Sequence, residues 1–251
     1  EAEILSSLAD VSRKQGNSDV ALARHKQALK HYISQSNAVW AARTYNNIGY
    51  LLRRKNDLNK ALEAYGEVET ILSQSKGNEL LSSQITLARA LIDLGEVQRA
   101  REHAMDAHEA TEAMGDAALH ARAQAVLGRY YSKVEQSELA MFHYSAALEA
   151  MNEAGDLQAL VEITILLGEV LHDAGRIDDA MEHYREALVI AEANDLRMQI
   201  GELLTRLGGA APDRQGRMEY LQRALSVFRE LGARSRMKEV QMMVHRAVMG
   251  R

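Results

Sequence analysis

Arginines and asparagines recur between residues 43 and 133, and these side chains are the ones best suited to chemistry. The densest stretch runs from Arg43 to Arg54 and contains an asparagine pair, Asn46-Asn47. A guanidinium binds a carboxylate through two parallel hydrogen bonds, and an asparagine amide pairs with an extended backbone. These residues therefore favour binding of an acidic or C-terminal peptide. The alternative is that they are ordinary solvated charges on helix surfaces.

Other kinds of chemistry lack the residue patterns that they need. The nine histidines include the pairs His103/His108 and His172/His183, and neither spacing puts two ligands on one helix face as i and i+4 would. The sequence has no glycine-rich phosphate loop and no nucleophile motif. We therefore expect no metal, no cofactor and no enzyme activity. Aromatic residues make up 5% of the chain, which is few for stacking RNA bases.

The composition indicates an almost entirely helical protein. The 251 residues include one proline and no cysteine, which excludes disulfides and thiolate metal sites and fits a reducing, cytoplasmic compartment. No apolar run approaches the roughly 20 residues that span a bilayer. A net charge of −5 argues against general nucleic-acid or membrane binding. Because the chain begins at Glu1, with no signal peptide and no initiator Met, we expect a fragment whose effector domain lies outside it.

A two-part pattern returns five times at a step of about forty residues, and a degraded sixth copy follows. One alanine marks the second part of each copy, at Ala21, Ala61, Ala100, Ala140 and Ala180. Earlier in each copy stands a small residue, at Ala9, Gly49, Ala88, Gly128 and Gly168. One helical turn after the marker alanine come His25, Tyr65, Ala104, Tyr144 and Tyr184. Such a period predicts stacked helix pairs, in which the small residues let two backbones approach closely and a larger side chain fills the space above.

Glycine and asparagine mark the junctions between these copies. The junctions are Gly115-Asp116, Gly155-Asp156 and Asn194-Asp195. The first residue of each accepts the left-handed conformation that ends a helix, and the aspartate is expected to cap the next helix. In the sixth copy, Gly208, Gly209 and Pro212 should shorten the first helix.

These signals predict a succession of helices without an internal linker. The expected helices are 2–15, 18–34, 37–54, 57–74, 78–94, 97–113, 116–133, 137–153, 156–173, 177–193, 195–209, 214–231 and 233–248. We predict a single array over residues 1–251. Its expected repeats are about 2–36, 37–76, 77–115, 116–155, 156–194 and 195–232, and 233–248 is a final helix.

Repeats two, four and five share a longer pattern. It consists of Ile48-Gly49, Ala61 and Tyr65; Leu127-Gly128, Tyr131, Ala140, Tyr144 and Ala147-Leu148; and Leu167-Gly168, Ala180, Tyr184 and Ala187-Leu188. The pattern resembles the tetratricopeptide repeat family across nearly the whole chain, in a variant longer than the usual repeat of about 34 residues. Similar long repeats occur in kinesin light chains and bacterial regulators. The resemblance implies an all-α, right-handed α-solenoid of about six antiparallel helix pairs with a terminal capping helix.

In this family the first helix of each repeat lines a concave groove that binds peptides. The resemblance implies a groove lined by Arg43, Asn46, Asn47, Tyr50, Arg53, Arg54, Arg89, Arg122, Arg129 and Lys133. Asn47 stands where carboxylate-clamp members carry an Asn, whereas Ser82 and Thr86 replace the two basic residues expected in the next repeat. The leading hypothesis is a non-enzymatic protein- or peptide-binding scaffold, the sensing or interaction module of a bacterial signalling or transcription-regulatory protein.

The final predicted helix has no following repeat to cover it. Met237, Val240, Met243 and Val244 fall on one of its faces, and an exposed apolar stripe of this kind marks an interface. The alternative function is therefore a self-association module that dimerises an effector domain outside this chain. A plain capping helix is the simpler interpretation of the same residues.

Overall fold

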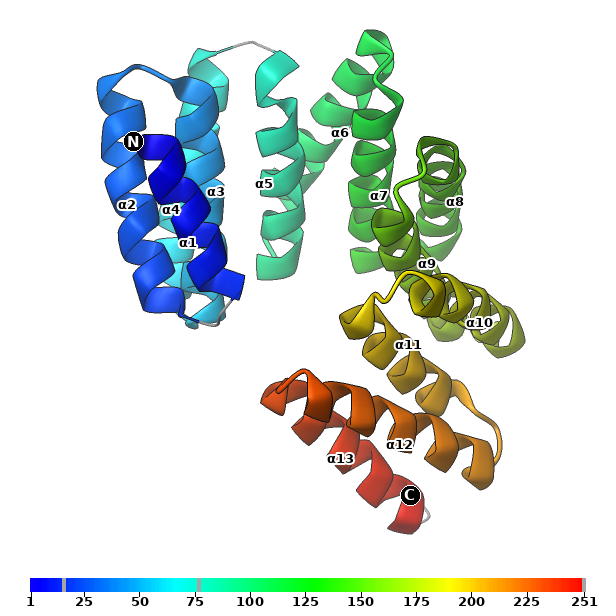
Figure 1. Cartoon of the computed structure of the whole chain (residues 1–251). Coiled ribbons are helices and arrows are strands. Elements are labelled where there is room, and N and C mark those ends of the chain that lie inside the picture. The colour runs from blue at the N-terminus through cyan, green and yellow to red at the C-terminus, as the bar shows by residue number, and fades with distance from the viewer. Residues whose placement is uncertain (15–16, 76–77, 250–251) are drawn as a thin grey trace. The chain divides into compact units, whose positions relative to one another are not determined.

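The computed structural model describes residues 1–14, 17–75 and 78–249, which are almost entirely helical. Within these ranges there are thirteen α-helices, one short 3₁₀ helix (η1, Asn78–Leu80) and no strand. The α-helices are α1 (Ala2–Lys14), α2 (Ser18–Ser34), α3 (Ala38–Arg54), α4 (Leu58–Gln74), α5 (Leu81–Leu94), α6 (Val97–Met114), α7 (Ala117–Lys133), α8 (Ser137–Ala154), α9 (Leu157–Asp173), α10 (Ile177–Ala193), α11 (Arg197–Ala210), α12 (Arg214–Glu230) and α13 (Arg234–Met249). From α1 to α6 and from α8 to α13, consecutive helices pack side by side (Figure 1), as the predicted all-α solenoid class requires.

Most predicted helix ends agree with the structure to within one residue. Several starts move by one residue because the expected first residue is a cap. The side-chain oxygens of Asn37, Asp116 and Asp156 each accept a hydrogen bond from the backbone N–H three positions on, at 3.2, 3.0 and 3.1 Å. The predicted ends at residues 15, 76 and 77 lie outside the described residues.

The junctions between repeats follow the prediction twice and depart from it once. Gly115 and Gly155 have positive φ, 71° and 70°, and end α6 and α8. Asn194 instead has a φ of −113°, and the left-handed residue is Asp195, at 51°. Asp195 is therefore not the cap of α11, which corrects its expected role. The shift is tolerated because both Asn and Asp enter the left-handed region more readily than most residues.

The chain divides into two compact units, Glu1–Tyr130 and Tyr131–Arg251. In the first unit α5 packs on α3 and α4, and in the second α11 packs on α9 and α10. Within each unit the first helices of neighbouring pairs thus lie side by side. The single array over residues 1–251, with the repeat limits given above, stays a prediction.

Glycine and tyrosine pack directly against each other inside two of the helix pairs. A Cβ atom on Gly49 would lie 2.6 Å from both Cε1 and Cζ of Tyr65, and one on Gly168 would collide with the ring of Tyr184. Both tyrosines are 1% exposed. Only glycine therefore lets the ring lie so close to the backbone of the first helix.

Repeats one and three carry smaller pairs at the same two positions. Alanine replaces glycine at Ala9 and Ala88, and the tyrosine becomes His25 and Ala104 respectively. These four residues are at most 1% exposed. Where alanine takes the place of glycine on the first helix, the facing residue on the second helix is thus smaller than tyrosine, as dense packing requires.

The sixth pair keeps this packing with a shifted ring. Its first helix, α11, has 14 residues where α9 has 17, which confirms the expected shortening. A Cβ on Gly201 would lie 2.6 Å from Cε1 of Phe228, and one on Gly208 would lie 2.7 Å from Cδ2 of Leu221. Phe228 therefore takes the place of the tyrosine, near the start of α11 rather than its middle.

Helix α13 packs on α12 with the stripe that was expected to be exposed. Val240 is 1% exposed, and Met237, Met243 and Val244 are half-buried. A Cβ on Gly209 of α11 would lie 3.4 Å from Cε of Met243. Val240 therefore packs inside the chain, which removes it from the predicted dimer stripe, and the homodimer itself stays a prediction. Helical spacing shows that these residues share a face, but it does not show which neighbour covers that face.

Candidate functional site

Three guanidinium groups surround Tyr50 on α3. Arg13 of α1 and Arg53 and Arg54 of α3 each place Cζ 5.9 Å from the centroid of the Tyr50 ring. Arg53 and Arg54 follow Tyr50 by three and four positions, so one turn of helix brings them beside the ring. Arg13 reaches it from the neighbouring first helix. Attraction between each cation and the ring stabilises this gathering of like charges.

Asp93 on α5 connects this group to α7. Its Oδ2 lies 3.1 Å from Nη1 of Arg53, and its Oδ1 lies 3.2 Å from Nη1 of Arg129. The three side chains are between 27% and 32% exposed, so water reaches all of them. One carboxylate therefore bridges two guanidinium groups from the first helices on either side of it.

Tyr65 is a buried tyrosine in this unit whose pKa responds to the charged groups around it. Burial raises the pKa of Tyr65 to about 12, Asp93 acts in the same direction, and Arg53 and Arg89 oppose the rise. The hydroxyl group is therefore neutral at physiological pH. Arg89 precedes Asp93 by four residues on α5, so one turn of helix places it on the same face as Asp93.

This arginine cluster has more positive than negative charge. Its arginines are Arg13, Arg53, Arg54, Arg89 and Arg129. The carboxylates beside them are Asp93 and Asp10, whose Oδ1 lies 3.6 Å from Nε of Arg13. Arg54 and Arg89 are exposed and form no ion pair with any residue that the structure describes. They can therefore bind the carboxylates of another molecule.

The other predicted site residues have different positions. Arg43 is exposed, with Cζ 5.2 Å from the ring centroid of Trp40, and Asn47 is partly exposed on the same helix. Arg122 is exposed on α7. Lys133 belongs to the second unit and is described with it.

Asn46 is not available to a ligand. It is 4% exposed, and its Nδ2 donates a 2.9 Å hydrogen bond to the backbone oxygen of Ser83. The side chain therefore ties α3 to α5, which corrects its expected place in the groove. Adjacent helical residues point about 100° apart, and here Asn46 turns inward while Asn47 stays partly exposed.

The bridging role of Asp93 was not predicted from the sequence. Its signal lies in the repeat step, because Arg13, Arg53, Asp93 and Lys133 follow one another at forty-residue intervals (13, 53, 93, 133). Such residues stand at equivalent heights on successive first helices. The partner of Asp93 on α7 is nevertheless Arg129, one turn before Lys133. The exact partner depends on side-chain reach, which spacing does not supply.

The second unit also joins its first helices by ion pairs, but there the charges balance. Nε of Arg206 on α11 donates a 2.7 Å hydrogen bond to Glu169 on α9. Arg236 of α13 donates to Glu202 of α11 at 2.8 Å and to Glu239 at 3.0 Å. Each arginine here has at least one carboxylate of its own.

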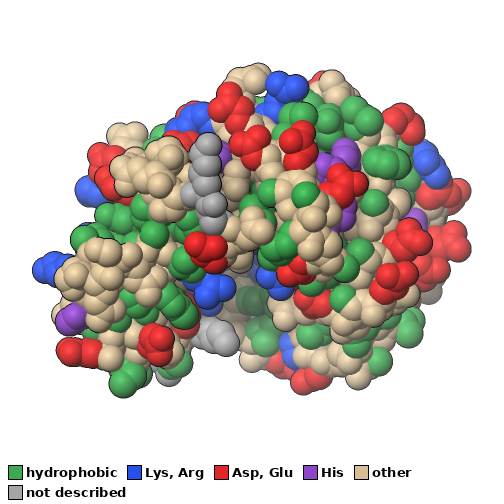
Figure 2. Space-filling view, turned by 90° about the horizontal axis from the view of Figure 1, so that it is seen from above, with side chains coloured by type: hydrophobic (Ala, Val, Ile, Leu, Met, Phe, Trp, Pro, Cys, Tyr) green, Lys and Arg blue, Asp and Glu red, His purple; other side chains and the backbone are tan. Residues whose placement is uncertain are grey.

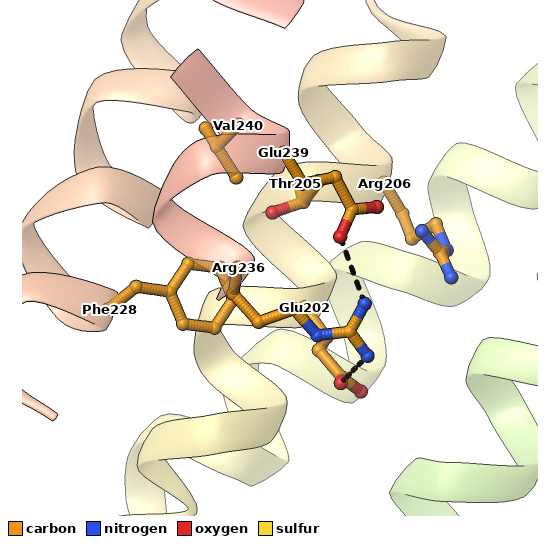
Figure 3. Close-up of a pocket in the computed structure, with 7 residues that line it drawn as sticks. All are labelled: Glu202, Thr205, Arg206, Phe228, Arg236, Glu239 and Val240. Carbon is orange, nitrogen blue, oxygen red and sulfur yellow. Dashed lines mark hydrogen bonds and ion pairs between the residues drawn. The ribbon is translucent and has the colours of Figure 1, made fainter. Parts of the chain in front are cut away.

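A small pocket lies beside the last of these ion pairs. Arg236 extends between Glu202 and Glu239 along its wall, next to Phe228 and Val240 (Figure 3). Since the guanidinium of Arg236 is already neutralised by two carboxylates, this pocket does not offer a free cation to an anionic ligand.

The rest of the described surface has a mixed character. Acidic, basic and hydrophobic side chains are interspersed over the face seen in Figure 2. Within residues 1–14, 17–75 and 78–249, no group of three or more His, Asp or Glu side chains could hold a metal ion. No helix in these ranges is both long and apolar enough to cross a membrane. The arginine cluster is thus a local feature of a mixed surface.

Comparison of sequences identifies the type of repeat in three segments of the chain. Two family models, each described as tetratricopeptide repeat, match residues 1–74 and residues 81–104 and 161–186. Tetratricopeptide repeats are thus identified within these three segments of the chain. The matched segments include the Gly49–Tyr65 and Gly168–Tyr184 contacts, so the repeat pattern corresponds to real packing. No functionally curated protein matches the chain in sequence.

Solved structures share this repeat fold at low sequence identity. The apo form of RapI is 16% identical, with a TM-score of 0.70, and the match covers 99% of this chain and 97% of RapI. A signal transduction ATPase with a tetratricopeptide repeat sensor from Pyrococcus horikoshii is 16% identical, with a TM-score of 0.71, over 98% of this chain and 38% of that protein. The Rap conjugation gene regulator of plasmid pLS20, in complex with the Phr* peptide, is 15% identical, with a TM-score of 0.69. The match covers 96% of this chain and 71% of that regulator. These likenesses show the fold.

Proposed function

We propose that this tetratricopeptide repeat chain is a non-enzymatic protein- or peptide-binding module, the sensing or interaction part of a signalling or transcription-regulatory protein. The observation that carries the proposal is the arginine cluster of the first unit. There, Arg54 and Arg89 are exposed and unpaired among the described residues, and Asp93 neutralises only part of the charge around it. The ligand is a protein segment with acidic side chains or a C-terminal carboxylate.

Because a single exposed ion pair is weak, the ligand needs more than one carboxylate. An exposed ion pair contributes only about 0.2–1 kcal/mol. A segment with one carboxylate would therefore bind weakly, whereas a segment with several can engage Arg54 and Arg89 together. The ring of Tyr50 beside Arg54 offers an apolar surface on which the stem of a bound side chain can pack.

Two of the similar structures support a role in regulation. One is a Rap regulator in complex with a peptide, and the other contains a tetratricopeptide repeat sensor. They are 15% and 16% identical to this chain, so they support the class of function. The acidic chemistry of the ligand rests on the arginine cluster alone.

Self-association is the second candidate function. Met242 and Met249 are 57% and 62% exposed on α13, on the side of the helix away from Val240. A dimer through this outer face would bring together two copies of an effector domain attached to the chain. This outer face takes the place of the predicted stripe centred on Val240, because Val240 packs inside the chain.

A charge-reversal experiment tests peptide binding. The double variant Arg54→Glu/Arg89→Glu is compared with the natural chain for binding of a labelled polyglutamate peptide and its polyglutamine counterpart. We expect an affinity for polyglutamate at least tenfold weaker in the variant, because two attractive charges become repulsive. The matched control is Arg101→Glu on α6, a second helix, where the exposed arginine also has no ion pair among the described residues. Equal affinity in the double variant and the control would refute the arginine cluster as the binding site.

A further inference from the structure

The outer face of α1 carries an apolar stripe that is open to solvent. Ile4, Leu8 and Val11 are 65%, 43% and 49% exposed. Their spacing of four and three residues places them on one side of the helix. Aliphatic side chains exposed together at helical spacing point to a packing surface rather than to a solvated helix face.

The same positions are buried in repeats two to five. The counterparts of Ile4 are Thr44, Ser83, Ala123 and Ile163; those of Leu8 are Ile48, Leu87, Leu127 and Leu167; those of Val11 are Leu51, Ala90, Tyr130 and Val170. These twelve residues are at most 8% exposed. The position is therefore an interface position of the repeat, and among repeats one to five only repeat one leaves it uncovered.

The structure also shows what covers these positions elsewhere in the first unit. Helix α3 packs on α2, and α5 packs on α3 and α4. Ser83, the counterpart of Ile4 on α5, accepts a hydrogen bond from Asn46 of α3 through its backbone oxygen. At the junction of α2 and α3, Ala28 and Tyr32 form a buried cluster with Ala41. The covering element is thus the preceding helix pair, whose second helix carries a buried small or β-branched residue at the position of Ala28, namely Val68, Ala107, Ala147 and Ala187 in the later repeats.

We propose that α1 is an internal helix of a longer array and that its outer face receives a further helix pair of the same type, carried by the same polypeptide upstream of Glu1. The proposal rests on the continuity of this stripe with the interface that buries its counterparts in the later repeats. The occupant is an amphipathic helix pair whose second helix carries a small apolar residue at the position of Ala28, Val68, Ala107, Ala147 and Ala187. This inference is independent of the arginine cluster and its ligand.

The test compares residues 1–251 with the natural polypeptide extended upstream of Glu1. In the extended polypeptide we expect the amide hydrogens of α1 to exchange at least tenfold more slowly. Leu8→Glu should lower the Tm of the extended polypeptide by several degrees more than that of residues 1–251, because only there does it bury a charge.

The matched control is Ile33→Glu on α2. Ile33 is 54% exposed, and its counterparts Ser73, Glu112, Asn152 and Glu192 are all exposed polar residues. It should change the Tm equally in both polypeptides. Unchanged exchange in α1, or equal effects of Leu8→Glu in both polypeptides, would overturn the proposal. A dimer of residues 1–251 that Leu8→Glu dissociates in sedimentation would overturn it as well, because the occupant would then be a second copy.

Discussion

In each unit, ion pairs join the first helices of neighbouring repeats. The two units differ in whether the arginines there outnumber the carboxylates. In the first unit, the carboxylate of Asp93 serves both Arg53 and Arg129. In the second unit, Glu169 serves Arg206, and Arg236 has two carboxylates. The same scaffold thus uses charge in two ways: the second unit uses it to connect helices, and the first keeps a surplus that a ligand can neutralise.

The difference also separates stability from binding. Exposed ion pairs contribute little to the free energy of unfolding, whereas the glycine–tyrosine contacts in the cores of both units are tightly packed. Changes in the core should therefore alter folding, and changes in the arginine cluster should alter ligand affinity. Each prediction below tests one side of this separation.

Overpacking the core of the second unit should have the largest effect. Gly168→Leu would force a side chain into the ring of Tyr184 and cost roughly 1–3 kcal/mol or more. Thermal unfolding should show a clearly lower Tm, while binding of polyglutamate by the first unit persists below that transition. A Tm equal to that of the natural chain would contradict the close contact.

Removing the negative charge of Asp93 should strengthen binding. In Asp93→Asn the guanidinium groups of Arg53 and Arg129 lose their carboxylate, so a ligand meets more unneutralised charge. We expect polyglutamate to bind about 3- to 10-fold more tightly, which corresponds to roughly 1 kcal/mol. The control is Glu202→Gln in the second unit, which frees charge near Arg236 without touching the cluster. Weaker binding by Asp93→Asn would show that Asp93 orients the arginines for the ligand instead of competing with it.

A buried histidine should make the stability of the first unit depend on pH. His25 is 0% exposed, and neither ring nitrogen has a hydrogen-bond partner in the described part of the chain. Burial lowers the pKa of His25 below its ordinary value of 6.5, with Asp10 opposing the shift and Arg13 adding to it. The unfolded chain therefore binds more protons, so stability is complete above about pH 6.5 and falls as the pH decreases below it.

The measurement is the Tm of the natural chain and of His25→Leu between about pH 5 and pH 8. Leucine has a similar volume but does not titrate. The loss of stability at low pH should be smaller in the variant. Parallel curves would assign the pH dependence to other groups.

A glycine in open space should give the smallest effect and the opposite sign. A Cβ on Gly66 in α4 would meet no atom within 4 Å. Gly66→Ala should therefore stabilise the chain by about 0.5–1 kcal/mol, because alanine loses less backbone freedom in a helix. At Gly95, which has a φ of 84°, the same change should destabilise it. A lower Tm for Gly66→Ala would show that α4 does not tolerate a side chain there.

The sequence predicted the fold well because the repeat makes local signals redundant. Glycine–tyrosine pairs, marker alanines and left-handed glycines each recur, so most helix ends agree to within one residue. The misplaced junction at Asn194-Asp195 involves two residues that both tolerate positive φ, and nothing in the sequence ranks them. The burial of Val240 on α13 could not be predicted either, because helical spacing shows which residues share a face but not which helix packs against that face.

The candidate site was less accessible to sequence analysis. The resemblance placed Tyr50, Arg53, Arg54 and Arg89 on the first helices, and the structure brings all four into one cluster. It could not show that Asn46 turns inward to bond α5, because that depends on the distance between two helices. Side-chain contacts between repeats therefore required the structure.

Amide hydrogen exchange with and without polyglutamate tests the central claim most directly. The claim is that the charge surplus of the first unit, and not the balanced pairs of the second, binds an acidic segment. The account predicts slower exchange in the parts of α3 and α5 around Tyr50 and Arg89 and no change in α9 and α11. Protection confined to α9 and α11, or no protection in either unit at saturating peptide, would contradict it.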